Sequence, residues 1–106
     1  MKRYEIRWTA LDPVRDAEMA KTRPAVIVSL DVLNDELRTV TVCPLTTQLH
    51  PNWRSRLQVR CGRQRAEIAV DQIRTISKSR MGDKLGQLTD DEAAALRRLI
   101  TEMYGE

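Results

Sequence analysis

Several residue types that mark familiar protein classes are scarce in this chain of 106 residues. It has no phenylalanine, one histidine, two cysteines, and four residues each of glycine and proline. No apolar run approaches the ~20 residues that a membrane-spanning helix requires, and the polar first five residues (MKRYE) exclude the apolar segment of a signal peptide. We therefore expect a cytoplasmic protein.

The few cysteines and the single histidine exclude further classes. Cys43 and Cys61 are far apart and in no CxxC or Cys/His spacing, which excludes a zinc site, a disulfide framework and redox chemistry. Any Ser-His-Asp or Cys-His arrangement would have to use His50, which we interpret as a surface histidine in a loop. A Gly-rich phosphate loop and the spacing of a metal-dependent nuclease are also absent, so we expect no metal or cofactor.

The composition that remains is 42% hydrophobic and 31% charged, which predicts one globular domain over residues 1–106. Net charge is +3, but residues 54–84 carry nine basic and three acidic groups, a balance of +6. Residues 1–53 sum to zero and residues 85–106 to −3. The basic middle indicates either a polyanionic partner such as a nucleic acid or a solvated basic surface.

Alternating or continuous apolar residues predict short strands at 4–8, 25–28, 39–43, 57–59, 68–70 and 73–76. Pro44 is expected to close the third strand, and Gly82 and Gly86 to interrupt the segment after the last one. Thr89 and Glu92 form a capping box before a C-terminal amphipathic helix. The fold class expected is mainly β with a C-terminal helix, closed as a small antiparallel barrel that protects its edges.

Residues 14–23 form a long polar connection between the first two strands, either a functional lid or a plain loop.

Without a metal ion, cleavage of a phosphodiester is possible only for RNA, where the 2′-hydroxyl attacks the neighbouring phosphorus. The protein then has to stabilise the extra negative charge of the transition state, which fixed Arg and hydroxyl donors do well. Arg23, held by Pro24, and Thr46, at a neighbouring strand end, suit this chemistry, although a lone Arg is more often a surface ion-pair partner.

Five segments in order along the chain resemble one known family: 11–13 (LDP), 21–29 (KTRPAVIVS), 42–47 (VCPLTT), 71–76 (DQIRTI) and 79–82 (SRMG). The chain is similar to the MazF/PemK toxin endoribonucleases over nearly its whole length. The resemblance implies an SH3-like barrel of the MazF/PemK/CcdB type that forms a homodimer. It also implies sequence-selective, metal-independent cleavage of single-stranded mRNA, growth arrest, and neutralisation by an antitoxin with an acidic C-terminal segment.

The resemblance also implies roles for individual residues. The catalytic pair of the family falls on Arg23 and Thr46, and its RNA-contacting lid falls on residues 14–22, where Glu18 and Lys21 would face substrate. Gln48 would contact a base or a phosphate.

The chain departs from the family at several positions. The lid lacks the usual glycine, which should stiffen it, and Ala17 and Ala69 stand where one branch has a histidine and an arginine for acid-base chemistry. That scheme is not transferred, and Asp71 is interpreted as a structural residue that bonds backbone groups. Two roles are equally compatible with Arg74: a contact with an RNA phosphate or an ion pair within the barrel.

Trp53 lies in a basic loop, where its indole would stack on an unpaired base or pack within the chain or a dimer, with packing slightly preferred. For Trp8, packing is strongly preferred. Four arginines would attract RNA or an acidic antitoxin segment to one surface: Arg54, Arg56, Arg63 and Arg65.

Two other functions fit the same fold, because a fold alone does not decide function. The first is a non-catalytic toxin that poisons DNA gyrase through its C-terminal helix, although Tyr104-Gly105-Glu106 lacks the ending expected of that class. The second is an RNA-binding module without nuclease activity, which the presence of Arg23 and Thr46 argues against.

Overall fold

The computed structural model describes residues 1–11 and 22–105. Its elements in chain order are β1 (Glu5–Ala10), β2 (Thr22–Ile27), α1 (Asp31–Glu36), β3 (Thr39–Thr46), β4 (Arg56–Cys61), β5 (Gln64–Ala69), the 3₁₀ turn η1 (Val70–Gln72), β6 (Arg74–Ser77), the 3₁₀ turn η2 (Lys78–Arg80), β7 (Met81–Gln87) and α2 (Asp90–Tyr104).

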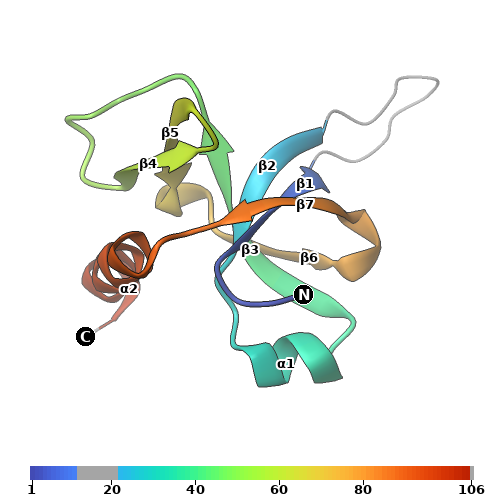
Figure 1. Ribbon diagram of the computed structural model, residues 1–106. Coiled ribbons are helices and arrows are strands. Elements are labelled where there is room, and N and C mark those ends of the chain that lie inside the picture. The colour runs from blue at the N-terminus through green and yellow to red at the C-terminus, as the bar shows by residue number, and fades with distance from the viewer. Residues whose placement is uncertain (12–21, 106) are drawn as a thin grey trace.

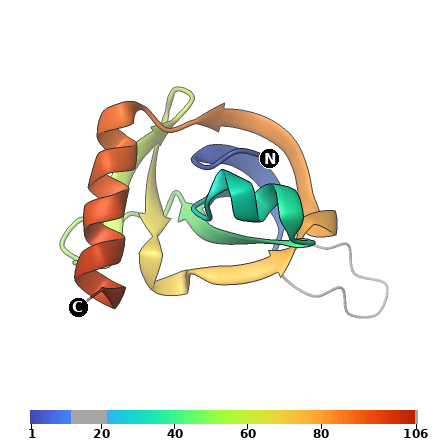
Figure 2. The ribbon, with the colours of Figure 1, turned by 90° about the horizontal axis from the view of Figure 1, so that it is seen from below.

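The strands form one antiparallel, strongly curved sheet in the order β4-β5-β3-β2-β1-β7, with β6 paired to β3 (Figure 1). One edge of β3 changes partner along its length, because Val42 pairs with Arg74 of β6 whereas Leu45 pairs with Ile68 of β5. The sheet curves around the middle of the molecule as a half-barrel, and α2 runs along one side beside β4 (Figure 2). The predicted fold class, mainly β with a C-terminal helix, is confirmed, but among the described residues the sheet ends at β4 and β7 and does not close as expected.

The main core lies between the curved sheet and α2. Ile6, Val26 and Ile68 from three strands pack with Leu96 of α2, and all four are at most 2% exposed. The predicted capping box is confirmed, since Thr89 accepts from the Glu92 N–H and Glu92 accepts from the Thr89 N–H. At the other end of α2, the Tyr104 hydroxyl donates to the Val70 carbonyl over 3.0 Å, which ties the helix to the sheet.

The burial that alternation predicts for the first strand holds for Ile6 but not for Trp8. The pairing of β1 with β7 shifts register between Ile6 and Arg7 and again between Arg7 and Thr9, but the extra residues lie in β7, and β1 keeps an unbroken register with β2. Trp8 therefore stays on the face of Ile6 but is 41% exposed, whereas Thr9 on the opposite face is 0% exposed. Packing of Trp8 in the core of the chain was a wrong expectation, and only packing against another molecule remains open for it.

Two other strand predictions were wrong. Pro44 does not end β3, which continues to Thr46. Pro44 lies where that edge of β3 passes from β6 to β5, and proline is tolerated where no ladder bond is required. Residues 81–87 form the edge strand β7 despite Gly82 and Gly86. Its side chains are mostly exposed, so it shows no apolar alternation that could have revealed it.

Candidate active site

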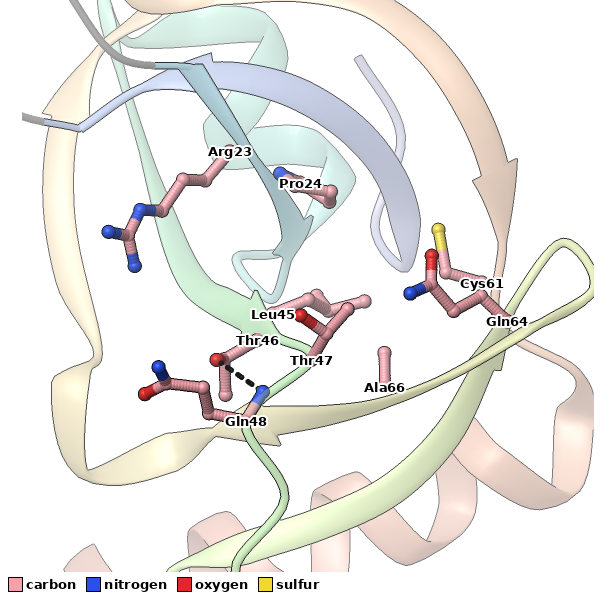
Figure 3. Close-up of a pocket in the computed structure, with 9 residues that line it drawn as sticks. All are labelled: Arg23, Pro24, Leu45, Thr46, Thr47, Gln48, Cys61, Gln64 and Ala66. Carbon is pink, nitrogen blue, oxygen red and sulfur yellow. Dashed lines mark hydrogen bonds between the residues drawn. The ribbon is translucent and has the colours of Figure 1, made fainter.

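A cavity of about 340 Å³ opens beside the ends of β2 and β3 and the β4–β5 hairpin (Figure 3). Its lining comprises Arg23, Pro24, Leu45, Thr46, Thr47, Gln48, Cys61, Gln64 and Ala66. Carbon-rich side chains form part of the wall, and the amides of Gln48 and Gln64 supply donors and acceptors. The cavity can therefore hold a flat apolar group and hydrogen-bond its edge.

Arg23 and Thr46 meet here because of strand register. Ala25 of β2 pairs with Pro44 of β3, and continuing this antiparallel register by two residues sets Arg23 opposite Thr46. The Thr46 hydroxyl accepts from the Gln48 N–H over 3.1 Å, so its own proton remains available to another acceptor. Arg23 is exposed, and within residues 1–11 and 22–105 its guanidinium has no ion-pair partner. Its charge is available to an anionic ligand.

A second cavity of about 120 Å³ adjoins the first and shares Arg23, Leu45, Thr46 and Gln48 with it. It is completed by Pro44, His50, Arg56, Ala69 and Gln72. Arg23 and Thr46 thus line both cavities. The predicted pair lies in one shared cleft.

The buried carboxylate of Glu67 holds two residues that line the second cavity, His50 and Arg56. Glu67 is 0% exposed and accepts hydrogen bonds from Gln58 Nε2 (2.8 Å), the His50 N–H (2.6 Å) and Arg56 Nη1 (2.7 Å). Burial on its own would raise the pKa of Glu67, but these three donors outweigh it and hold the pKa below its ordinary value.

Arg56 completes the ion pair, and its Nε also donates to Asp71 Oδ1 over 2.9 Å. Its side chain is only 7% exposed. Two carboxylates already neutralise much of its charge, yet Arg56 lines the smaller cavity, so its contact with RNA stays a prediction. The pKa of Asp71 is likewise lowered, since hydrogen bonds from Arg56 and Ser55 exceed the effect of burial. Asp71 is held mainly by the side chain of Arg56 and not by the backbone groups that were predicted.

The loop between β3 and β4 folds back on itself through aromatic contacts. The rings of His50 and Trp53 stack at 3.9 Å with 9° between their planes, and the Arg56 guanidinium carbon lies 4.7 Å from the centre of the Trp53 ring. Trp53 packs on these two neighbours but is 49% exposed, so it is not a core residue, and both packing in a dimer and stacking on a base stay predictions. His50 is half-buried and lines the smaller cavity, which the interpretation of His50 as a plain surface histidine did not anticipate.

The remaining predicted RNA contacts are spread over the surface. Arg54 pairs with Glu102 of α2, and both side chains are well exposed. Arg63 and Arg65 are exposed on the β4–β5 hairpin and line neither of the two cavities. Arg74 donates weakly to the Gln72 carbonyl over 3.4 Å and has no ion pair among the residues described.

Glu18 and Lys21 lie outside the described residues. Several residues of the cleft were not singled out for it from the sequence, among them His50, Cys61 and Gln64. For His50, the sequence did hold one indication of a place in the site, because His50 follows Thr46 by only four residues. Cys61 and Gln64 flank a turn. The sequence alone does not predict where this turn lies relative to β3.

Within the described part of the chain, no group of three His, Cys, Asp or Glu side chains is arranged to hold a metal ion. No helix in the same residues is long and apolar enough to cross a membrane.

Comparison with known proteins agrees with this architecture. Endoribonuclease EndoA of Bacillus subtilis strain 168 is 31% identical over 96 residues, which cover 86% of this chain and 83% of EndoA. Endoribonuclease MazF of Staphylococcus saprophyticus is 27% identical, with 99% of this chain and 92% of the relative covered. These names agree with the predicted enzyme class and not with a gyrase poison.

Among solved structures, an endoribonuclease in complex with its cognate antitoxin from a mycobacterial species superimposes with a TM-score of 0.82 at 20% identity, covering 99% of this chain and 95% of that one. A family model described as the PemK-like, MazF-like toxin of type II toxin-antitoxin systems matches residues 2–104. The chain belongs to this PemK/MazF-like toxin family, as the ordered motifs predicted.

Proposed function

We propose that this protein is a sequence-selective endoribonuclease that cleaves single-stranded RNA without a metal ion and acts as the toxin of a toxin-antitoxin pair. The observation that carries the proposal is the position of Arg23 and Thr46, which line both cavities of one cleft. If a phosphodiester lies at this pair, one of its two nucleotides would enter the larger cavity and the other would enter the smaller cavity.

The chemistry follows from these two donors. The 2′-hydroxyl attacks the neighbouring phosphorus, and negative charge accumulates on the phosphoryl oxygens as the bond to the 5′-oxygen breaks. Arg23 offers a permanent, planar cation to those oxygens, and Thr46 offers a hydroxyl proton oriented by the Gln48 N–H. The products are a 2′,3′-cyclic phosphate and a 5′-hydroxyl.

The larger cavity supports selectivity for unpaired RNA. An unpaired base can leave the stack and enter a pocket, whereas a base inside a helix cannot. Pro24, Leu45 and Ala66 would contact its faces, and Gln48 and Gln64 would bond its edge. The exposed Arg63 and Arg65 would attract the RNA backbone, in competition with the acidic C-terminal segment of a cognate antitoxin.

The active form would be a homodimer, which inhibits translation by cutting mRNA. Leu30, Leu33 and Leu37 are exposed before, within and after the short helix α1. Exposed apolar residues that gather in this way are typical of an interaction surface.

The test is cleavage of denatured total RNA by the purified protein in EDTA, with both new ends sequenced and chemically identified. We expect cuts at one short sequence, with cyclic-phosphate and 5′-hydroxyl ends. Arg23→Ala and Thr46→Val should each lower the cleavage rate about 10²–10³-fold, because each removes a donor from the transition state. Arg38→Ala, which removes an exposed arginine that lines neither cavity, should retain the wild-type rate. Intact RNA with the wild-type protein would refute the proposal.

A further inference from the structure

The smaller cavity contains a group suited to proton transfer. Its polar lining comes from Arg23, Thr46, Gln48, His50, Arg56 and Gln72. Guanidinium groups keep their protons in proteins, and amides and aliphatic hydroxyls are too weak as acids and bases to transfer a proton near neutral pH. Among the described side chains of this cavity, only the imidazole of His50 readily gives and takes a proton under such conditions.

Two independent contacts fix the place of His50. Its ring stacks on Trp53 at 3.9 Å, and its backbone N–H donates to Glu67 Oε1 over 2.6 Å. Glu67 is itself held by Arg56 and Gln58, so the backbone of His50 is tied to a fully buried ion pair of the sheet. A histidine held in this way is oriented before substrate arrives, which proton transfer in a transition state requires.

The charges around His50 come from four elements. Arg23 of β2 lines the same cavity, Arg56 of β4 lies over the neighbouring Trp53, Glu67 of β5 bonds the His50 backbone, and Asp71 of η1 pairs with Arg56. Of these, only Arg23 has no partner among the described residues. Its positive field favours loss of the 2′-hydroxyl proton, but a guanidinium does not protonate a departing alkoxide.

We propose, on the basis of the proposed endoribonuclease function, that His50 is the general acid of the reaction. The bond from the 2′-oxygen to phosphorus forms and the bond from phosphorus to the 5′-oxygen breaks. The electron pair of the broken bond stays on the 5′-oxygen, which takes a proton from the imidazolium and leaves as a hydroxyl. The proton of the 2′-hydroxyl passes to water, and the imidazole is reprotonated from solvent after release.

A substrate with sulfur in place of the bridging 5′-oxygen tests this role directly. A thiolate is a far weaker base than an alkoxide, so a sulfur leaving group does not need a general acid. The substrate is a short RNA carrying the cleavage sequence mapped for the wild-type protein, in oxygen and sulfur forms, cleaved under single-turnover conditions. His50→Phe is the informative variant, because it retains an aromatic ring to stack on Trp53 but cannot transfer a proton.

We expect His50→Phe to cleave the oxygen substrate about 10²–10⁴-fold more slowly than wild type and the sulfur substrate within about tenfold of wild type. Arg23→Ala should be slow on both, since phosphoryl charge develops in either case. Equal slowing of His50→Phe on both substrates, or a wild-type rate on the oxygen substrate, would overturn the role of His50 and leave the proposed function intact. Absence of cleavage by the wild-type protein would overturn both. A thermal melt of His50→Phe confirms that the variant is folded.

Discussion

At the scale of single residues, the contrast between two arginines shows how burial decides what a charge can do. Arg54 and Arg56 are two positions apart and both were expected to contact RNA. Arg54 pairs with Glu102 in water, where an ion pair contributes little. Arg56 is enclosed and bonded to Glu67 and Asp71, so removing one partner would leave an uncompensated buried charge. Arg56 therefore stabilises the floor of the cleft.

The lowered pKa values of Glu67 and Asp71 predict sensitivity to acid. A carboxylate whose pKa is lower in the folded than in the unfolded protein stabilises the fold above the unfolded value of about 4. This stabilisation is lost as pH falls through the lower, folded value. We expect the free energy of unfolding, measured by urea titration, to decrease between about pH 5 and pH 3.

The variant Glu67→Gln should be less stable than wild type at pH 7 but should lose less stability over the same acid range, because one of the coupled carboxylates no longer titrates. Glu36→Gln, which alters an exposed carboxylate of α1, serves as the control and should follow the wild-type slope. Parallel slopes for Glu67→Gln and wild type would show that this carboxylate is not linked to folding.

At the scale of elements, the β4–β5 hairpin depends on one backbone conformation. Gly62 has a φ of +64°, in the left-handed region that side chains with a Cβ disfavour. On either side of this turn, Cys61 and Gln64 line the larger cavity. The turn therefore sets both the hairpin and one wall of the proposed base pocket.

Gly62→Ala should lower the free energy of unfolding by about 1–2 kcal/mol, because in the left-handed region a Cβ lies too close to the following carbonyl oxygen. The matched control is Gly86→Ala in β7, where an added Cβ meets nothing within 4 Å and φ is not positive. Gly86→Ala should change stability by less than about 0.5 kcal/mol. Chemical denaturation of both variants measures these free energies of unfolding. Equal losses of stability in Gly62→Ala and Gly86→Ala would contradict the conformational explanation.

At the scale of the whole molecule, the proposed homodimer should depend on the three exposed leucines around α1. A charge placed on Leu33 would have to be buried without a partner if these leucines form the subunit contact, and such burial is strongly unfavourable. Leu33→Glu should therefore shift the protein from dimer to monomer in sedimentation velocity or light scattering. Asp35→Lys alters an exposed polar residue of the same helix and should leave the dimer intact. A dimeric Leu33→Glu would place the contact elsewhere.

The sequence predicted the parts of this protein that local interactions determine. The capping box of α2 needs only residues three positions apart, and the family motifs around Arg23 and Thr46 are continuous segments, so both could be read directly from the chain order. The sheet was harder. β7 lacks alternation because it lies exposed at an edge, and Trp8 stays exposed although it lies on the same face as the buried Ile6, because the cover on a face depends on residues distant in the chain.

The composition and motif order of the chain were sufficient for a mainly β fold with one terminal helix and for the choice of Arg23 and Thr46. Tertiary structure alone decided that these two line one cleft, that Arg56 is enclosed by Glu67 and Asp71, and that His50 reaches the cleft. The physical reason is that capping and turn formation depend on neighbours in the chain. Burial and strand register depend on residues far away in sequence, whose positions are fixed only when the whole sheet has formed.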